Sequence, residues 1–332
     1  MASGKLLRQL ISSGARGDHT AFRAATEAVI QEERQKKHHL LANDLERLLY
    51  AEQATFGDGK GGGRPTFSEL PKSSDSSIPL MEERPAVRQE KDIVLSDEAR
   101  SVLEEILLEQ NRADLLRSYG VQPAQKLLFC GPSGCGKTLA AEVLANSLSL
   151  PLVLVRIDSV VSSFLGETAS NLRKVFDFVS RNPVVALFDE FDALAKDRGD
   201  DSDHGELKRS VNAVLQMLDS YRGESILIAT TNYDDLLDPA VWRRFDETVR
   251  FEMPNLEQIK RLLELKLSGI RRNFDLDAGG TASLFKGLSH AAIERVLRRA
   301  VKQMILSGRE FLELADLKAA LAREYNKKQP QG

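Results

Sequence analysis

The fold is decided by one stretch of the sequence, Gly131-Pro132-Ser133-Gly134-Cys135-Gly136-Lys137-Thr138, which matches the pattern G-x-x-x-x-G-K-[ST] between an apolar run and a helical pattern. In that context the glycines let backbone N–H groups converge on phosphate oxygens at the start of a helix. Lys137 adds a positive charge near the phosphates, and Thr138 offers a hydroxyl to Mg²⁺. The alternative interpretation, a glycine-rich turn without a ligand, leaves Lys137 pointing into an empty anion site. The stretch therefore predicts a phosphate-binding loop, in which Cys135 is only a small residue.

On either side of this loop, short β-rich runs alternate with helical patterns. The runs cover residues 127–130, 152–157, 184–188 and 226–230. This alternation predicts a parallel sheet with crossover helices. After Pro254 the β-rich runs cease, and helical periodicity returns near residues 255–268, 289–306 and 313–324. We therefore expect an α/β fold in which a P-loop NTPase sheet at 93–253 is followed by a helical lid domain at 254–326.

The first 92 residues have a different character. Apolar residues recur at helical spacing between residues 3 and 53, which predicts a small helical bundle at 1–55. The bundle has two interpretations: it recruits a client or partner, or it packs on itself as an oligomerisation domain. From residue 56 to 92 the periodicity stops and Gly, Pro and Ser accumulate. We expect this second segment to be a flexible linker.

Two acidic residues and an amide follow neighbouring strands of the expected sheet. Asp189 and Glu190 come directly after the run at 184–188, at the strand end where such sheets place their ligands. We expect Asp189 to hold Mg²⁺ and Glu190 to orient an attacking water. Alone, the pair would be two solvated carboxylates at a turn; the phosphate loop disfavours that interpretation. Asn232 ends the next strand, where its amide is placed to reach the attacking water or the γ-phosphate, although by itself it would be a turn residue.

The composition and charge of the chain limit the classes of function that it can have. The 332 residues carry a formal net charge of −3, from 46 basic and 49 acidic side chains, so no overall positive field favours binding to a nucleic acid. The two cysteines, Cys130 and Cys135, have neither metal-ligand spacing nor a disulfide framework, which favours a reducing, cytoplasmic setting. No apolar run reaches about 18 residues, so no membrane segment is expected.

Four motifs in this order resemble those of the AAA family of ring ATPases, over residues 93 to about 325. They are the phosphate loop, Asp189-Glu190, Thr231-Asn232 and the stretch 237–246, which carries Arg243 and Arg244. The resemblance implies an ATP hydrolase with ATP and Mg²⁺ as cofactors, assembled as a homo-oligomeric ring of six subunits. It also implies that Arg244, with Arg243 as a second finger, reaches the ATP of the neighbouring subunit. Because no Pro-Gly pair separates these arginines, the stretch is most similar to the katanin, spastin and vacuolar-sorting branch, and the chain resembles a compact single-ring member of the classical clade.

The same resemblance extends to a pore loop and to the lid. The segment with Phe164, Leu165 and Gly166 is similar to the family's pore loop, in which the first two side chains would grip a substrate; the alternative is a buried loop anchor. The stretch 287–292 resembles the helix start that closes over the adenine. We therefore expect Ile93, His290 and Ala291 to contact the nucleotide. The family usually has glycine where His290 stands, so an ordinary histidine at a capped helix start is the alternative.

Three functions compete. The first is an ATP-dependent ring that remodels or unfolds a protein substrate drawn past its pore loops. The second is an ATP-gated switch subunit that works with a dedicated effector, for example a protease in a bacterial antiviral defence system. In both, the protein partner is expected to bind through the N-terminal bundle. The third, a nucleic-acid loader, calls for a basic stripe with interleaved aromatics, whereas the arginine pairs at 271–272 and 298–299 suit solvated faces of the lid.

Overall fold

The computed structural model describes residues 19–35, 67, 70–73, 78–160, 167–191, 213–232, 239–276 and 280–328. The chain divides into two compact units, an N-terminal unit (Met1–Thr66) and a larger unit (Phe67–Gly332). In the N-terminal unit the structure describes helix α2 (His19–Gln35), in which Ala25, Val29 and Ile30 are buried. The other helices expected within residues 1–55 lie outside the described residues.

The larger unit is built on a mixed sheet with the strand order β1-β3-β4-β5-β2-β6. The strands from β2 to β6 pair in parallel, and β1 joins the edge antiparallel to β3. Their bounds are β1 (Met81–Arg84), β2 (Lys126–Cys130), β3 (Leu152–Val155), β4 (Val185–Phe188), β5 (Ile226–Thr231) and β6 (Glu247–Arg250). The α/β class with a parallel-dominated sheet is therefore confirmed.

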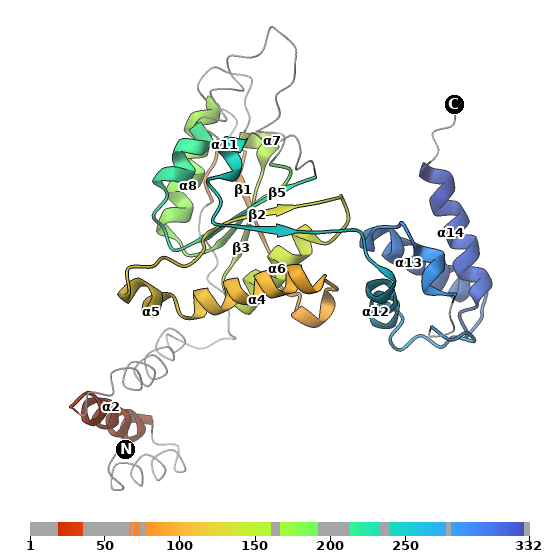
Figure 1. The fold of residues 1–332 in the computed structure, drawn as a ribbon, viewed down its shortest axis with the longest axis horizontal. Helices are drawn as coiled ribbons and strands as arrows, with labels where there is room; N and C mark the ends of the chain where they lie inside the picture. The colour runs from red at the N-terminus through yellow and green to blue at the C-terminus, as the bar shows by residue number, and fades with distance from the viewer. Residues whose placement is uncertain are drawn as a thin grey trace. The chain divides into compact units, whose positions relative to one another are not determined.

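Helices cover both faces of this sheet, because successive side chains of a strand point to opposite faces. On β4, Val185 and Leu187 pack in one apolar cluster with α6, whereas Ala186 and Phe188 pack in another with α8. Figure 1 shows α4 and α6 on one side of the sheet and α8 on the other. The helices of this layer include α4 (Asp97–Asn111), α5 (Ala113–Ser118), α6 (Lys137–Ser147), α7 (Ile157–Val160), α8 (Glu167–Arg181) and α11 (Pro239–Trp242), with a short 3-10 turn η2 (Glu90–Asp92). Residues 213–220 are helical as well.

The expected linker does not extend to residue 92. Residues 81–84 form β1, whose Met81 pairs with Val155, and the side chains of Leu80 and Met81 are fully buried. Farther upstream, the Phe67 ring packs edge-on against Phe178 of α8, with centroids 5.1 Å apart. The sequence of β1, Met-Glu-Glu-Arg, lacks apolar alternation, so only its pairing with β3 reveals it as a strand. The run expected at 152–157 also ends early, since β3 stops at Val155 and α7 begins at Ile157.

The expected helical lid corresponds to α12 (Leu256–Lys266), the 3-10 helix η4 (Ala282–Phe285), α13 (His290–Leu306) and α14 (Leu314–Lys328). Their apolar faces form a separate core in which Ile259, Phe285 and Ile293 are fully buried. Asn255 begins α12 with a capping box, and the Ser289 hydroxyl caps α13 by accepting the Ala292 N–H at 3.4 Å. Among the helices that the structure describes, none is long and apolar enough to cross a membrane.

Candidate functional site

The phosphate loop runs from the end of β2 to the start of α6 and depends on its glycines. Gly131, Gly134 and Gly136 have φ angles of 136°, 77° and 101°, which disfavour any side chain. A Cβ atom on Gly131 would clash with the backbone carbonyl of Phe251, which follows β6. The loop therefore takes this path only because glycines occupy these positions, and it presents the first N–H groups of α6 to a ligand.

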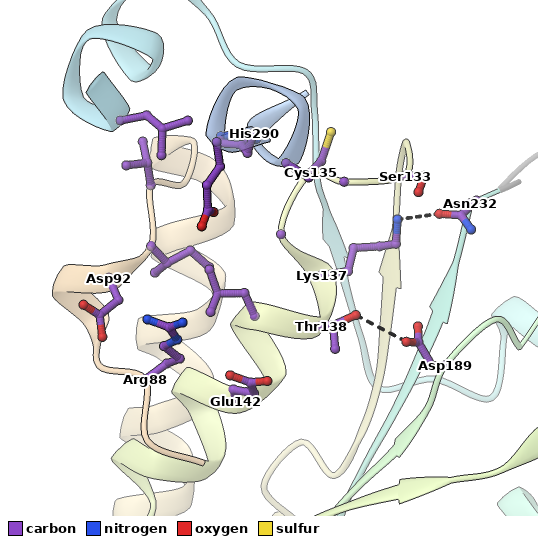
Figure 2. A pocket seen from close by; sticks show the side chains of 18 of the residues that line it. Arg88, Asp92, Ser133, Cys135, Lys137, Thr138, Glu142, Asp189, Asn232 and His290 are labelled. Atoms are coloured by element: carbon purple, nitrogen blue, oxygen red, sulfur yellow. Dashed lines mark hydrogen bonds between the residues drawn. The ribbon is translucent and has the colours of Figure 1, made fainter. Parts of the chain in front are cut away.

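Lys137 is almost fully buried, at 7% exposure, and its ammonium group is held by three oxygens. Its Nζ donates to the carbonyl oxygens of Gly131 at 2.6 Å and Pro132 at 3.0 Å, and to Oδ1 of Asn232 at 2.9 Å. Figure 2 shows the Lys137 side chain reaching toward Asn232 from the start of its helix. These bonds place a positive charge inside the loop and join it to Asn232, which follows β5.

The acidic pair lies beside the loop, directly after β4. Oδ2 of Asp189 accepts from the Thr138 hydroxyl at 3.4 Å, as Figure 2 shows. Hard oxygen donors of this kind are the ligands that Mg²⁺ takes from proteins, usually together with substrate phosphates. Within the described ranges, no group of three or more His, Cys, Asp or Glu side chains is placed to hold a metal. Thr138 and Asp189 thus fit an ion that is bound together with a phosphate.

A residue that sequence reasoning missed connects this pair to β5. The Thr230 hydroxyl donates to Oδ1 of Asp189 at 2.5 Å and accepts the backbone N–H of Glu190 at 3.2 Å. Glu190 itself has a φ of 55°, in the left-handed region that few non-glycine residues adopt. The only signal in the sequence is the position of Thr230 at the end of an apolar strand, two residues before Asn232.

Lys137, Thr138, Asp189, Glu190 and Asn232 line one cavity of about 440 Å³, a size typical of small-molecule sites. At one end lie the phosphate loop, Asp189, Glu190 and Asn232. Residues before α4 and on the lid line the rest of the cavity. Some are apolar, among them Ile93, Val94 and Leu262, and others are charged, among them Arg88, Asp92 and Lys266. The cavity thus combines a polar end at the phosphate loop with an end where an apolar patch of Ile93, Val94 and Leu262 is bordered by charged side chains.

The start of α13 closes the apolar end. The Ala291 N–H donates to the carbonyl oxygen of Gly134 at 3.0 Å, which ties the lid to the phosphate loop. Beside it, neither ring nitrogen of His290 has a hydrogen-bond partner, although both are buried. This burial lowers the pKa of His290, because it disfavours the charged imidazolium. His290 and Ala291 both line the cavity, as does Ile93; their contact with the nucleotide stays a prediction.

Other expected residues stand apart from the cavity. Arg244 forms an ion pair with Asp219, with Nε 2.9 Å from Oδ2, and Arg243 is exposed. Neither arginine is among the described residues that line the cavity. Phe164, Leu165 and Gly166 lie outside the part of the chain that the structure describes.

A glycine loop before a helix, strand-end carboxylates and a helical lid around one cavity define a P-loop nucleotide-binding protein. Residues 127–253 match the model of the ATPase family associated with various cellular activities (AAA). The chain is 40% identical to the uncharacterized AAA family ATPase y4kL of Sinorhizobium fredii, across all of this chain and 98% of that protein. It therefore belongs to the AAA family of ATPases, and its activity is ATP hydrolysis.

More distant relatives carry names that describe a role. The chain is 30% identical to the proteasome-activating nucleotidase of Methanothermobacter thermautotrophicus, over 85% of this chain and 72% of that protein. It is also 31% identical to the ATP-dependent zinc metalloprotease FtsH 3 of Sphaerobacter thermophilus. That match covers 68% of this chain and 47% of the metalloprotease, so the chain spans about half of that relative's length.

Proposed function

We propose that this chain is one subunit of a homo-oligomeric ring, of six subunits, that uses ATP hydrolysis to remodel or unfold protein substrates. The observation that carries the proposal is its similarity, over 85% of its length, to a protein named as a proteasome-activating nucleotidase. That name assigns the relative a nucleotide-dependent action on a proteolytic partner. The cavity in the larger unit supplies the nucleotide site that such an action needs.

The cavity residues have separate roles in this proposal. Thr138 and Asp189 hold Mg²⁺, which supplies charge neutralisation to the β- and γ-phosphates when it is bound. Glu190 orients the attacking water, and Asn232 contacts that water or the γ-phosphate. Ile93, His290 and Ala291 contact the adenine. The 3.4 Å separation of the Thr138 and Asp189 oxygens supports the first of these roles.

The arginines act between subunits. Arg244, with Arg243, approaches the γ-phosphate of a neighbouring subunit's ATP. The proposal is supported by the absence of both arginines from the described lining of the chain's own cavity. An arginine supplied by another subunit raises the rate of phosphoryl transfer by roughly 10³ to 10⁵. An isolated subunit should therefore hydrolyse ATP very slowly.

We assign binding of the protein substrate to segments outside the nucleotide cavity. Phe164, Leu165 and Gly166 form the pore loop, and the helical bundle at 1–55 recruits the client. A sheet domain that includes β1 and ends at residue 253, and a lid at 254–326, move against each other as ATP is hydrolysed. Separate lid and sheet cores support this division, because each can move as a body.

A second candidate is an ATP-gated switch whose output passes through a dedicated effector such as a protease, including one in a bacterial antiviral defence system. The names of both kinds of relative, an activator of a proteasome and an ATP-dependent metalloprotease, favour a proteolytic effector. In this candidate the chain changes the effector's activity without unfolding a substrate itself.

One experiment separates the two candidates. ATP turnover is measured against protein concentration, with and without an unstructured protein substrate, for the wild type and Phe164→Ala. Turnover that rises steeply with concentration, and is stimulated by substrate only when Phe164 is present, supports the remodelling ring. Turnover that depends on neither concentration nor Phe164 overturns that proposal and favours the switch.

A further inference from the structure

The buried hydroxyl of Thr230 touches both Asp189 and Glu190. It lies on β5, the strand beside β4, and is 1% exposed. Its side chain donates to Oδ1 of Asp189 at 2.5 Å and accepts the Glu190 N–H at 3.2 Å. Its own carbonyl accepts the Phe191 N–H at 2.8 Å. Three consecutive residues after β4 are therefore fixed by a single residue of β5.

The direction of these bonds is determined by hydrogen counting. A backbone N–H can only donate, so the Glu190 bond uses a lone pair of the Thr230 oxygen. The single hydroxyl hydrogen of Thr230 remains free for Asp189, which accepts it as a carboxylate. The Thr230 hydroxyl therefore donates to Asp189 at 2.5 Å and accepts from Glu190 at 3.2 Å.

The two oxygens of the Asp189 carboxylate therefore have different partners. Oδ1 is occupied by Thr230, whereas Oδ2 faces the Thr138 hydroxyl at 3.4 Å, on the side of the phosphate loop. Without the Thr230 bond the carboxylate could rotate about its own axis. The same hydroxyl also holds the N–H of Glu190, whose left-handed φ of 55° requires support from its surroundings.

We propose that Thr230 is a positioning residue: its hydroxyl aims Oδ2 of Asp189 at the metal position and holds Glu190 in the conformation that faces the cavity. The inference rests on the proposed roles of Asp189 and Glu190. Thr230 touches neither nucleotide nor metal in this scheme and acts through the acidic pair. Residues that orient a metal ligand typically change metal affinity or activity about 10- to 100-fold when they are replaced.

The test compares Thr230→Val, which keeps the shape and removes the hydroxyl, with Thr230→Ser, which keeps the hydroxyl. A matched control is Thr281→Val, because Thr281 is also buried and its hydroxyl donates at 3.2 Å to the Asp275 carbonyl in the lid. Full-length proteins are titrated with Mg²⁺ while the binding of a fluorescent ATP analogue is followed. Binding in EDTA is measured as well, to report on the fold and on the phosphate loop.

We expect Thr230→Val to bind the nucleotide normally in EDTA, but to need roughly 10- to 100-fold more Mg²⁺ for half of the metal-dependent increase in affinity. Thr230→Ser and Thr281→Val should stay near the wild type. A Thr230→Val titration that matches the wild type overturns the inference, and so does a Thr230→Ser variant as impaired as Thr230→Val. If the valine variant does not fold, Thr230→Ala is compared with Thr230→Ser by the same criteria. A wild type without any Mg²⁺-dependent ATP turnover would instead overturn the proposed function, whatever the variants do.

Discussion

Replacing Gly134 with alanine tests how tightly the phosphate loop is coupled to the lid. A Cβ atom at this position would lie 2.8 Å from Oγ of Ser289 and 3.0 Å from Cβ of Ala291. Both neighbours are fixed to the start of α13, so the lid must move away. The Ala291 N–H bond to the Gly134 carbonyl, at 3.0 Å, should be lost in that movement.

The expected loss of stability is judged by comparison with a second glycine that has the same backbone conformation. Gly269 has a φ of 78°, against 77° for Gly134, and nothing lies within 4 Å of its Cβ position. Gly269→Ala therefore carries only the cost of a left-handed residue, about 1–2 kcal/mol. Gly134→Ala carries that cost and loses the lid contact as well. A hydrogen bond contributes about 0.5–1.5 kcal/mol net, which corresponds to a roughly 2- to 12-fold loss of affinity for a nucleotide that needs the closed lid.

Thermal unfolding and the binding of fluorescent ADP are the two assays. We expect both variants to unfold at a lower temperature than the wild type, with Gly134→Ala the lower of the two. Only Gly134→Ala should bind ADP more weakly. Equal unfolding temperatures for the two variants, together with wild-type ADP affinity for Gly134→Ala, would refute the idea that the loop and the lid are in firm contact.

Three further predictions address the acidic pair, the arginines and the lid. Glu190→Gln should bind ATP as the wild type does but hydrolyse it at least about 100-fold more slowly, measured by nucleotide binding and phosphate release; wild-type turnover would remove Glu190 from its role. Arg244→Ala should be inactive alone, whereas mixing it with Lys137→Ala subunits should restore part of the ATPase rate; assembled mixtures that remain inactive would contradict action between subunits. Burial lowers the pKa of His290 in the folded chain. As the pH falls below about 6.5, the unfolded chain therefore binds a proton that the folded chain does not, and the free energy of unfolding decreases. The unfolding temperature of His290→Gln should therefore fall less than that of the wild type between pH 7.5 and 5.5. An equal fall in both proteins would contradict the lowered pKa of His290.

The parts of the fold that the sequence predicts are those with a strong local signal. Predominantly apolar runs bounded by turns located β2, β4 and β5, and the glycine pattern located the loop before α6. Helical periodicity located α12, α13 and α14. In each case the local pattern and the tertiary environment require the same conformation, so single-sequence reasoning succeeds.

The remaining parts depend on long-range contacts. β1 and β6 are edge strands with charged sequences, and only Val249 of β6 is buried. Edge strands face solvent on one side, so they lack the continuous apolar runs of central strands. Thr230 was missed for a similar reason: inside an apolar strand a threonine looks like an ordinary β-former, and its role depends on a turn that is 41 residues away in sequence.

The attachment of the N-terminal unit has a mechanical consequence. The chain that leads from that unit into the sheet makes two contacts in the larger unit. Phe67 packs against Phe178, and β1, a strand of four residues, pairs at the edge of the sheet. Tension applied through the N-terminal unit therefore loads these attachments before it loads the parallel strands that carry the site. An edge strand can be peeled from its single neighbour one hydrogen bond at a time, whereas a central strand must break both ladders. Load on the chain ahead of β1 is therefore opposed by the burial of Leu80 and Met81 and by one ladder of hydrogen bonds, whereas β4 and β5 are each held by two ladders.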